Sequence, residues 1–324
     1  MTETWQQPII AISGPTCSGK TALAVGAAKA LNGEVVNFDS VQIYSGIEIA
    51  TAKPTAEEME GVPHHLIGYV DPNVNYTAAD WARDAAEKIR EIEARGKCVI
   101  LVGGTGFYLR TLRQPLFESP KTDERLRERL RNIVARRGND HIHKMLRRVD
   151  PKAAAEFEAN DSVRVTRALE HFFQTGVKIS EVWHKRAEPP EFASRIRLFV
   201  LDPDREALYE KINHRTEAHF RNGLVDEVKH LLAEGVNQYG NALGAHAYRR
   251  VCEYLRGERT LESAIEKSKQ DVRNYAKRQW TWFRKEADAY WIAGFGGEDK
   301  ALKELLSEVK MPTQIPDHGY NASI

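Results

Sequence analysis

The chain has 324 residues, with 47 Lys and Arg against 46 Asp and Glu, so its formal net charge is +1. Hydrophobic residues make up 42% and charged residues 29% of it, which are globular proportions and exclude a disordered or collagen-like chain. The longest apolar run, residues 98–102, is far shorter than the roughly 20 residues that span a bilayer. Because the start carries no secretory pattern and the three cysteines have no paired spacing, we expect a cytoplasmic protein.

The first third of the chain alternates strand and helix patterns. Short, almost continuously apolar runs at residues 9–13, 34–38 and 98–102 predict strands. The Ala- and Leu-rich residues 21–31 and the longer stretch 78–95 predict helices between them. Strands that alternate with helices are typical of βαβ units and a parallel sheet, and continuously apolar strands suit a sheet covered on both faces.

From about residue 120 the pattern becomes helical and rich in Arg and Leu. No strand pattern returns before residues 196–201, which follow Pro189 and Pro190. Helical patterns lie at residues 123–136, 141–148, 162–174, 206–234 and 260–287. We therefore expect four segments: the first part of an α/β core at 1–119, a helical insertion at 120–195, the rest of the core with C-terminal helices at 196–312, and a disordered tail at 313–324.

The clearest motif follows the first strand and matches G-x-x-x-x-G-K-[ST] at every fixed position. It consists of Gly14, Pro15, Thr16, Cys17, Ser18, Gly19, Lys20 and Thr21. Its glycines let backbone N–H groups approach phosphate oxygens, and the helix that opens at Lys20 adds partial positive charge. Lys20 supplies a full charge, and Thr21 offers a hydroxyl to a metal ion. The motif predicts a bound phosphate chain, with Mg²⁺ as the cofactor held by Thr21.

Two polar residues follow the other strands of the expected sheet. Asp39 comes after the strand at 34–38, and Thr105 lies in a glycine-rich turn where a P-loop motor or GTPase would carry an acid. Because ligands bind at the carboxyl ends of parallel strands, both residues should face the P-loop. There Asp39 can accept a proton from a nucleophile, and Thr105 can offer its hydroxyl to a leaving oxygen. A turn-capping Asp and a plain strand-to-helix turn are the alternative interpretations.

A net charge near zero hides two basic segments. Residues 121–150 hold ten Lys or Arg against five acids, and residues 273–285 hold five Lys or Arg and no acid. In the second segment cations alternate with aromatic residues, a composition that suits backbone phosphates and stacked bases. The alternatives are solvated helix faces and, for Trp280 and Phe283, a place in the core.

These residues describe an enzyme that moves a group from a phosphate-bearing donor to an acceptor held by Asp39. A small-molecule kinase would need the P-loop and ATP but not the two basic segments. A noncatalytic RNA-binding P-loop protein would need the basic segments but neither Asp39 nor Thr105. His64 and His65 are adjacent in an extended segment, so their side chains point to opposite faces and we do not expect a metal pair.

Several stretches, taken in order, resemble the bacterial tRNA dimethylallyltransferases, also called tRNA isopentenyltransferases. They are residues 14–21, 39–44 with 51–54, 63–66 with 76–80, 103–108 and 276–284. The resemblance implies an α/β fold: a P-loop parallel sheet flanked by helices, with an inserted all-helical RNA-binding subdomain. Two departures stand out, because Ala50 and Ala247 occupy positions where the family usually has glycine.

The reaction that this resemblance implies is transfer of a dimethylallyl group from dimethylallyl diphosphate to N6 of an adenosine. That adenosine lies 3′ of the anticodon in tRNAs that read codons beginning with U. Asp39 would be the general base, Thr105 would contact the leaving oxygen, and Arg215 would grip the diphosphate. The residues expected to touch the anticodon arm are Asp39, Ser40, Val41, Gln42, Thr105, Arg164, Arg167, Lys277 and Arg278. We expect a monomer with no membrane contact and no obligate protein partner.

Overall fold

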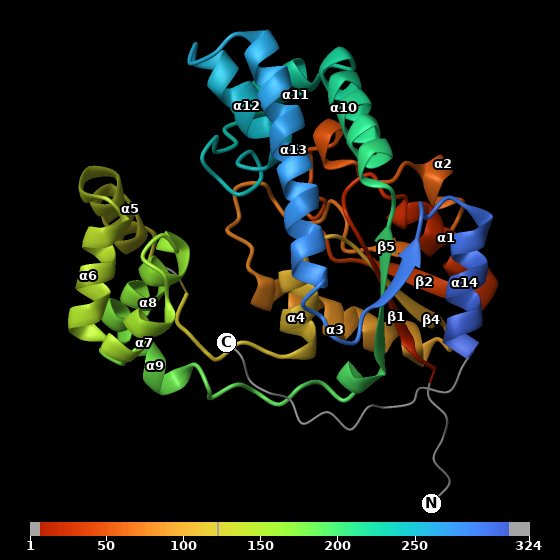
Figure 1. Cartoon of the computed structure of the whole chain (residues 1–324), viewed down its shortest axis with the longest axis horizontal. Coiled ribbons are helices and arrows are strands. Elements are labelled where there is room, and N and C mark those ends of the chain that lie inside the picture. Colours follow the sequence, from red (N-terminus) through yellow and green to blue (C-terminus); the bar gives the residue numbers. More distant parts are fainter. Residues whose placement is uncertain (1–6, 122, 311–324) are drawn as a thin grey trace, which may run out of the picture. The chain divides into compact units, whose positions relative to one another are not determined.

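The computed structural model describes residues 7–121 and 123–310. It divides the chain into two compact units, one made of Met1–Arg113 with Pro190–Ile324 and the other of Gln114–Pro189 (Figure 1). The second unit begins six residues before the expected start of the insertion at 120 and ends six residues before the expected end at 195. The tail expected to be disordered, 313–324, lies outside the described residues.

The larger unit contains one six-stranded sheet in which every neighbouring pair of strands is parallel, in the order β3-β2-β4-β1-β5-β6. Its strands are β1 (Ile9–Ser13), β2 (Gly33–Asn37), β3 (His64–His65), β4 (Cys98–Val102), β5 (Ile196–Asp202) and β6 (Tyr290–Ala293). The prediction of a parallel sheet is confirmed. The two short edge strands, β3 and β6, were not predicted.

The larger unit also contains the helices that flank the sheet and the C-terminal helices. They are η1 (Ile49–Thr51), α2 (Ala56–Met59), α3 (Ala78–Ala94), α4 (Gly106–Arg113), η2 (Ala193–Arg195), α1 (Lys20–Leu31), α10 (Arg205–Arg221), α11 (Leu224–Ala233), α12 (His246–Leu255), α13 (Leu261–Phe283) and α14 (Asp299–Lys310). The stretch predicted to be helical at 206–234 consists of two helices, because Gly223 takes a positive φ of 95° and separates α10 from α11.

Alternate residues of each central strand enter two different cores. From β1, Ile9 and Ala11 face a cluster that includes Trp81 of α3, whereas Ile10 and Ile12 face a cluster that includes Leu23 of α1. Helix α14 joins α1 on that second face (Figure 1). Because helices cover both faces, the central strands β1 and β4 are buried along their whole length, as their continuous apolar sequences predict.

The long helix α13 packs against α10 and α12 (Figure 1). Trp280 is 7% exposed and joins a cluster with Leu208 and Ile212 of α10, while Phe283 is 1% exposed and joins the α3-side core. Both aromatic residues are therefore core residues, which confirms the alternative interpretation given for them above.

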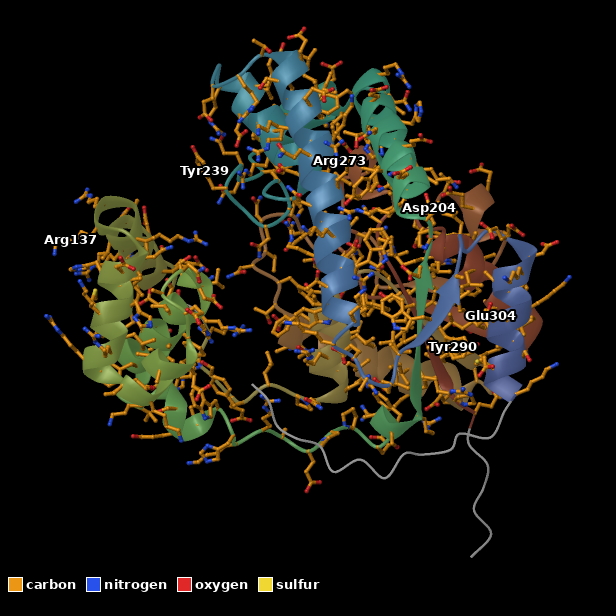
Figure 2. All side chains as sticks on the ribbon, viewed as in Figure 1. Arg137, Asp204, Tyr239, Arg273, Tyr290 and Glu304 are labelled. Carbon is orange, nitrogen blue, oxygen red and sulfur yellow. The ribbon has the colours of Figure 1, made fainter. Side chains whose placement is uncertain are left out.

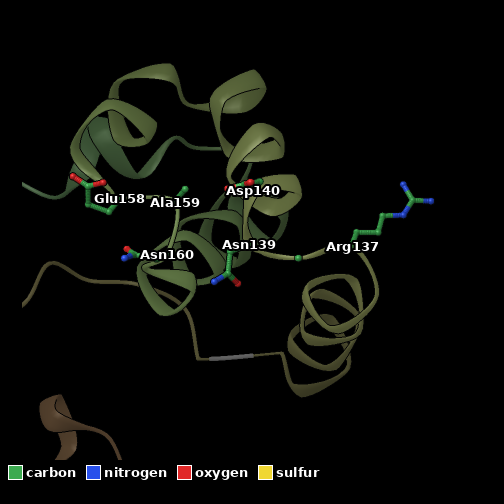
Figure 3. Close-up of a pocket in the computed structure, with 7 residues that line it drawn as sticks. Arg137, Asn139, Asp140, Glu158, Ala159 and Asn160 are labelled. Carbon is green, nitrogen blue, oxygen red and sulfur yellow. The ribbon is translucent and has the colours of Figure 1, made fainter.

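The smaller unit is helical and has its own apolar core. Its helices are α5 (Glu124–Arg137), α6 (Asn139–Val149), α7 (Pro151–Glu156), α8 (Ser162–Thr175) and α9 (Ile179–Val182). Ile142, Leu146 and Leu169 are fully buried at the centre of that core. An open hollow beside the α5–α6 junction is lined by charged and amide side chains, among them Arg137, Asp140 and Asn160 (Figure 3). Across residues 7–121 and 123–310, no helix is both long and apolar enough to cross a membrane.

Candidate active site

The P-loop connects the end of β1 to the first turn of α1, as the motif predicts. Gly19 precedes the helix with a φ of 86°, a left-handed conformation that glycine adopts without strain. Helix α1 then begins at Lys20, so its unpaired backbone N–H groups point toward the loop. Cys17 also takes a positive φ of 66°, and its side chain packs against the cluster around Trp280 as a small filler.

Lys20 folds back onto this loop. Its Nζ donates hydrogen bonds to the carbonyl oxygens of Gly14 (3.2 Å) and Pro15 (2.8 Å). Burial lowers the pKa of Lys20 from 10.5 to about 8, the negative charge of Asp39 opposes that shift, and the positive charge of Arg215 adds to it. An anion bound in the loop would restore the charged form of Lys20, which is the behaviour expected of a phosphate site.

Arg215 of α10 reaches the same loop from a distant part of the chain. Its guanidinium donates a hydrogen bond of 2.5 Å to Oγ1 of Thr16. Ser18 is fully buried, and its Oγ has no hydrogen-bond partner among the described residues. A buried hydroxyl without a partner is costly, so Ser18 offers a donor for an incoming oxygen. The loop thus brings Lys20, Arg215 and Ser18 together.

Asp39 and Thr105 meet because β2 and β4 are neighbours in the sheet. Oδ1 of Asp39 accepts hydrogen bonds from the backbone N–H groups of Val41 (2.9 Å) and Gln42 (3.3 Å). Oγ1 of Thr105 accepts from the backbone N–H of Ser40 at 3.0 Å and donates to its Oγ at 3.2 Å. One oxygen of Asp39 therefore caps a turn, and Oδ2 has no hydrogen bond within the described chain and can receive a proton.

The other residues of the Asp39 loop are held from within the protein. Val41 is 7% exposed and belongs to the core. Nε2 of Gln42 donates to the carbonyl oxygens of Thr51 (3.2 Å) and Ala52 (2.8 Å). Val41 therefore offers little surface to a nucleic acid, whereas Asp39, Ser40 and Gln42 are half-buried.

Two residues of α13, from the segment expected to touch tRNA, lie at the site in a way that was not predicted. Gln279 is 4% exposed; its Oε1 accepts from the backbone N–H of Thr16 (2.7 Å), and its Nε2 donates to the carbonyl oxygen of Gly104 (3.1 Å). Burial and the charge of Asp39 raise the pKa of Tyr275, while hydrogen bonds with Thr105 and Gln279 act in the opposite direction. Two sequence signals mark Gln279: it lies in the stretch 276–284 that resembles the family, and its helical position places it among apolar residues.

The cations expected to touch tRNA lie in both units. Lys277 and Arg278 are exposed on α13, and neither forms an ion pair with a described residue; Arg278 lies 5.8 Å from the ring of Tyr275. In the helical unit Arg164 lies 3.4 Å from Asp161, whereas Arg167 donates to Ser119 and lies 3.3 Å from Glu170. Arg167 is thus partly used within its own unit.

The two departures from the family pattern are buried. Ala50 is 8% and Ala247 2% exposed, and Ala247 lies near the start of α12, where alanine favours the helix more than glycine does. The hydroxyl of Tyr248 accepts from the backbone N–H of Ala50 (3.0 Å) and donates to Glu227 (2.9 Å). This part of the chain supports the segment behind the Asp39 loop.

No group of three or more His, Cys, Asp or Glu side chains in the described part of the chain can hold a metal ion. His64 and His65 contact different partners, the carbonyl oxygen of Val62 and the carboxylate of Glu34. Thr21 makes no hydrogen bond through its hydroxyl within the same residues. Its hydroxyl fits Mg²⁺, because this ion keeps several waters and takes few protein ligands when a phosphate is present.

Comparison with known proteins shows the family of the chain. The sequence model of a family described as IPP transferase matches residues 42–286. The chain is 42% identical to the tRNA dimethylallyltransferase of Geobacter metallireducens over 308 residues, covering 94% of this chain and 99% of that one. It is 45% identical to the enzyme of the same name from Geobacter sulfurreducens, covering 88% and 91%.

Solved structures with a similar fold have similar names. The full-length tRNA isopentenylpyrophosphate transferase of Bacillus halodurans has a TM-score of 0.69 and 39% identity, with 94% of this chain and 96% of that one covered. A eukaryotic dimethylallyltransferase studied acting on tRNA has a TM-score of 0.71 and 29% identity, with 89% and 74% covered.

Proposed function

The chain belongs to the IPP transferase family and is a tRNA-prenylating enzyme, and we propose that its donor is dimethylallyl diphosphate. The acceptor is N6 of the adenosine 3′ of the anticodon in tRNAs that read codons beginning with U. The product is N6-isopentenyladenosine. The proposal includes action in the cytoplasm, as expected from the sequence.

The observation that carries this proposal is that two half-sites meet at the carboxyl ends of β1, β2 and β4. The P-loop with Lys20 and Arg215 forms a cationic half that suits a diphosphate. The loop with Asp39 forms the other half and carries a carboxylate oxygen that makes no hydrogen bond in the described chain. The hydroxyl of Thr105 is hydrogen-bonded to Ser40, the residue that follows Asp39. It therefore lies in the half of the site that carries Asp39.

On the donor side, the reaction breaks a carbon–oxygen bond, and negative charge builds on the departing diphosphate. Lys20, Arg215 and the loop N–H groups are fixed donors for that charge, so they need no rearrangement as it develops. Loss of one such donor typically costs about 3 kcal/mol in the barrier. Thr105 would turn its one hydroxyl proton, which Oγ of Ser40 accepts in this structure, toward the bridging or leaving oxygen.

On the acceptor side, the adenine amine is a weak nucleophile because its lone pair is delocalised into the ring. Asp39 holds Oδ1 fixed in its turn and presents Oδ2 to the amine, from which it takes a proton as the new carbon–nitrogen bond forms. A general base of this kind contributes about 10²- to 10⁴-fold in rate. The base must leave its stack to reach Asp39, as other base-modifying enzymes require.

Thr21 would hold Mg²⁺ beside the diphosphate. When bound, the ion neutralises part of the diphosphate charge. Recognition of the anticodon arm is assigned to Ser40, to Lys277 and Arg278 on α13, and to the basic helical unit that carries Arg164. Their exposed cations suit a phosphate backbone.

One assay tests this function. The purified protein is incubated with labelled dimethylallyl diphosphate, Mg²⁺ and unmodified tRNA, and label in the RNA is counted. Label on the adenosine 3′ of the anticodon supports the proposal. Phosphate transfer from ATP without label in RNA would identify a kinase, and tRNA binding without turnover would identify a noncatalytic protein. Either result would reject the proposal.

A further inference from the structure

A buried glutamine connects two loops of the site that are far apart in sequence. Gln279 on α13 uses its oxygen for the N–H of Thr16 at 2.7 Å and its nitrogen for the carbonyl of Gly104 at 3.1 Å. Thr16 lies 263 positions and Gly104 175 positions from Gln279. Because the side chain is 4% exposed, water has little access to either backbone group if the glutamine is lost.

The lack of a side chain at Gly104 makes room for Gln279. A Cβ atom built on Gly104 would lie 2.0 Å from Nε2 of Gln279, so no other residue fits there without moving the glutamine. The neighbouring Gly106 shows the same constraint, since a Cβ there would lie 2.1 Å from Nε1 of Trp282 on the same helix. Glycines in this turn thus allow α13 to approach the backbone closely.

Tyr275, one turn earlier on α13, extends the bridge to the acceptor side. Its hydroxyl lies beside the same turn, 3.7 Å from a Cβ atom built on Gly104, and Asp39, Thr105 and Gln279 all influence its pKa. Thr105 is bonded in turn to Ser40. Hydrogen bonds of Gln279 therefore join the P-loop at Thr16 to Gly104, and the next residue, Thr105, is bonded to the loop of Asp39, with the hydroxyl of Tyr275 beside this turn.

We propose that Gln279 is a positioning residue that sets the separation between the diphosphate half of the site and the half that carries Thr105 and Asp39. This inference rests on the proposed function. Transfer requires the allylic carbon and the amine to approach to about 3–3.5 Å, and misplacement by an ångström can cost about 10²-fold in rate. Gln279 touches neither reacting atom and acts through the two loops it joins.

The bridge also assigns a role to Thr16. Its backbone N–H is already used by Gln279, and its hydroxyl accepts from Arg215. Thr16 therefore connects the loop to α13 and α10, and the phosphate oxygens are left to Lys20, Ser18, the remaining N–H groups of Arg215 and the N–H groups at the start of α1.

The test replaces Gln279 by methionine, which keeps the volume and removes both hydrogen bonds. Gln270→Met is the matched control, because Gln270 lies on the same helix with an exposed side chain. We expect Gln279→Met to lower kcat for prenyl transfer by at least about tenfold while the Kd for tRNA stays within about twofold of wild type. The control should change neither value.

Two results would overturn the inference. The first is a kcat of Gln279→Met equal to that of wild type. The second is a loss of activity that matches the fraction of protein unfolded, which would make Gln279 a purely structural residue. Wild-type protein that labels no tRNA would reject the proposed function instead, so the two failures are distinguishable.

Two further variants keep the test decisive if Gln279→Met fails to fold. Tyr275→Phe removes only the hydroxyl that lies beside Gly104, and it should lower kcat with the Kd for tRNA unchanged. Gly104→Ala with Gln279→Ala relieves the clash at 2.0 Å and should be more stable than Gly104→Ala alone, yet with low kcat. Wild-type kcat in either variant would contradict the bridge.

Discussion

Polar side chains are used in opposite ways in two regions of this molecule. At the candidate active site, buried polar groups are paired one by one with backbone groups, as Gln279 is with Thr16 and Gly104. On α5 and α6 of the helical unit, by contrast, many cations are exposed and form no ion pair with a described residue, among them Arg137 (Figure 2). Those that form no ion pair within the described residues are Arg125, Arg129, Arg131, Arg136, Arg137, Lys144, Arg147 and Arg148.

The contrast separates two kinds of specificity. A buried hydrogen bond depends on the position of single atoms, and leaving one partner unpaired costs about 1–3 kcal/mol. An exposed cation acts through a screened field, so its neighbours can replace much of its effect. We therefore expect single substitutions near Gln279 and Asp39 to have sharp effects, and those on α5 and α6 to have small, additive, salt-dependent effects.

The sharpest effect is expected at Asp39. Asp39→Asn keeps an acceptor for the N–H groups of Val41 and Gln42 but provides no base, whereas Asp39→Ala loses both functions. Both variants should lower kcat by about 10²- to 10⁴-fold with tRNA binding retained. Single-turnover labelling of tRNA measures the rate and filter binding the affinity. An asparagine variant with wild-type rate would reduce Asp39 to a turn-capping residue.

The second prediction concerns the close packing of Gly103 against the backbone of Phe38. A Cβ on Gly103 would lie 2.6 Å from the backbone carbonyl carbon of Phe38, directly before Asp39, so the backbone must shift. Gly103→Ala should lower the free energy of unfolding by about 1–3 kcal/mol in urea and disturb the Asp39 loop. The matched control is Gly297→Ala, where nothing lies within 4 Å and the change should stay within about 0.5 kcal/mol. Equal stabilities would remove the packing argument.

These two predictions also mark what could be read from the sequence. The strands β1 and β4 and the placing of Asp39 and Thr105 at one sheet edge follow from continuous apolar runs and from the rule for parallel sheets. The edge strand β3 has two residues, too few for any pattern. Gln279 was missed as a site residue because its role depends on a contact with Thr16 across 263 positions, which no local pattern contains.

The third prediction uses the pKa of Lys20, which burial lowers to about 8. Above this pH the free enzyme loses the ammonium charge, and a bound diphosphate restores it. The KM for dimethylallyl diphosphate should therefore be nearly constant below pH 8 and rise by up to about tenfold per pH unit above it. Lys20→Arg keeps its charge and should remove the rise. A pH-independent KM in wild type would show that Lys20 stays charged without ligand.

The smallest effects are expected from single exposed cations, and they are measured as changes in the salt dependence of tRNA affinity. Replacing Lys277 and Arg278 by alanine should reduce the slope of log affinity for tRNA against log salt by about 0.7–0.9 for each phosphate that the protein no longer neutralises. Arg164→Ala should act in the same way, because its side chain is 60% exposed and its only ion pair within the described residues is with Asp161.

Arg167→Ala also removes the bonds to Ser119 and Glu170, so it should lower the unfolding temperature as well. Because both arginines belong to α8, the difference between them isolates the contribution of charge from that of packing. An unchanged salt slope in Arg164→Ala would show that this helix face does not bind the phosphates of the tRNA.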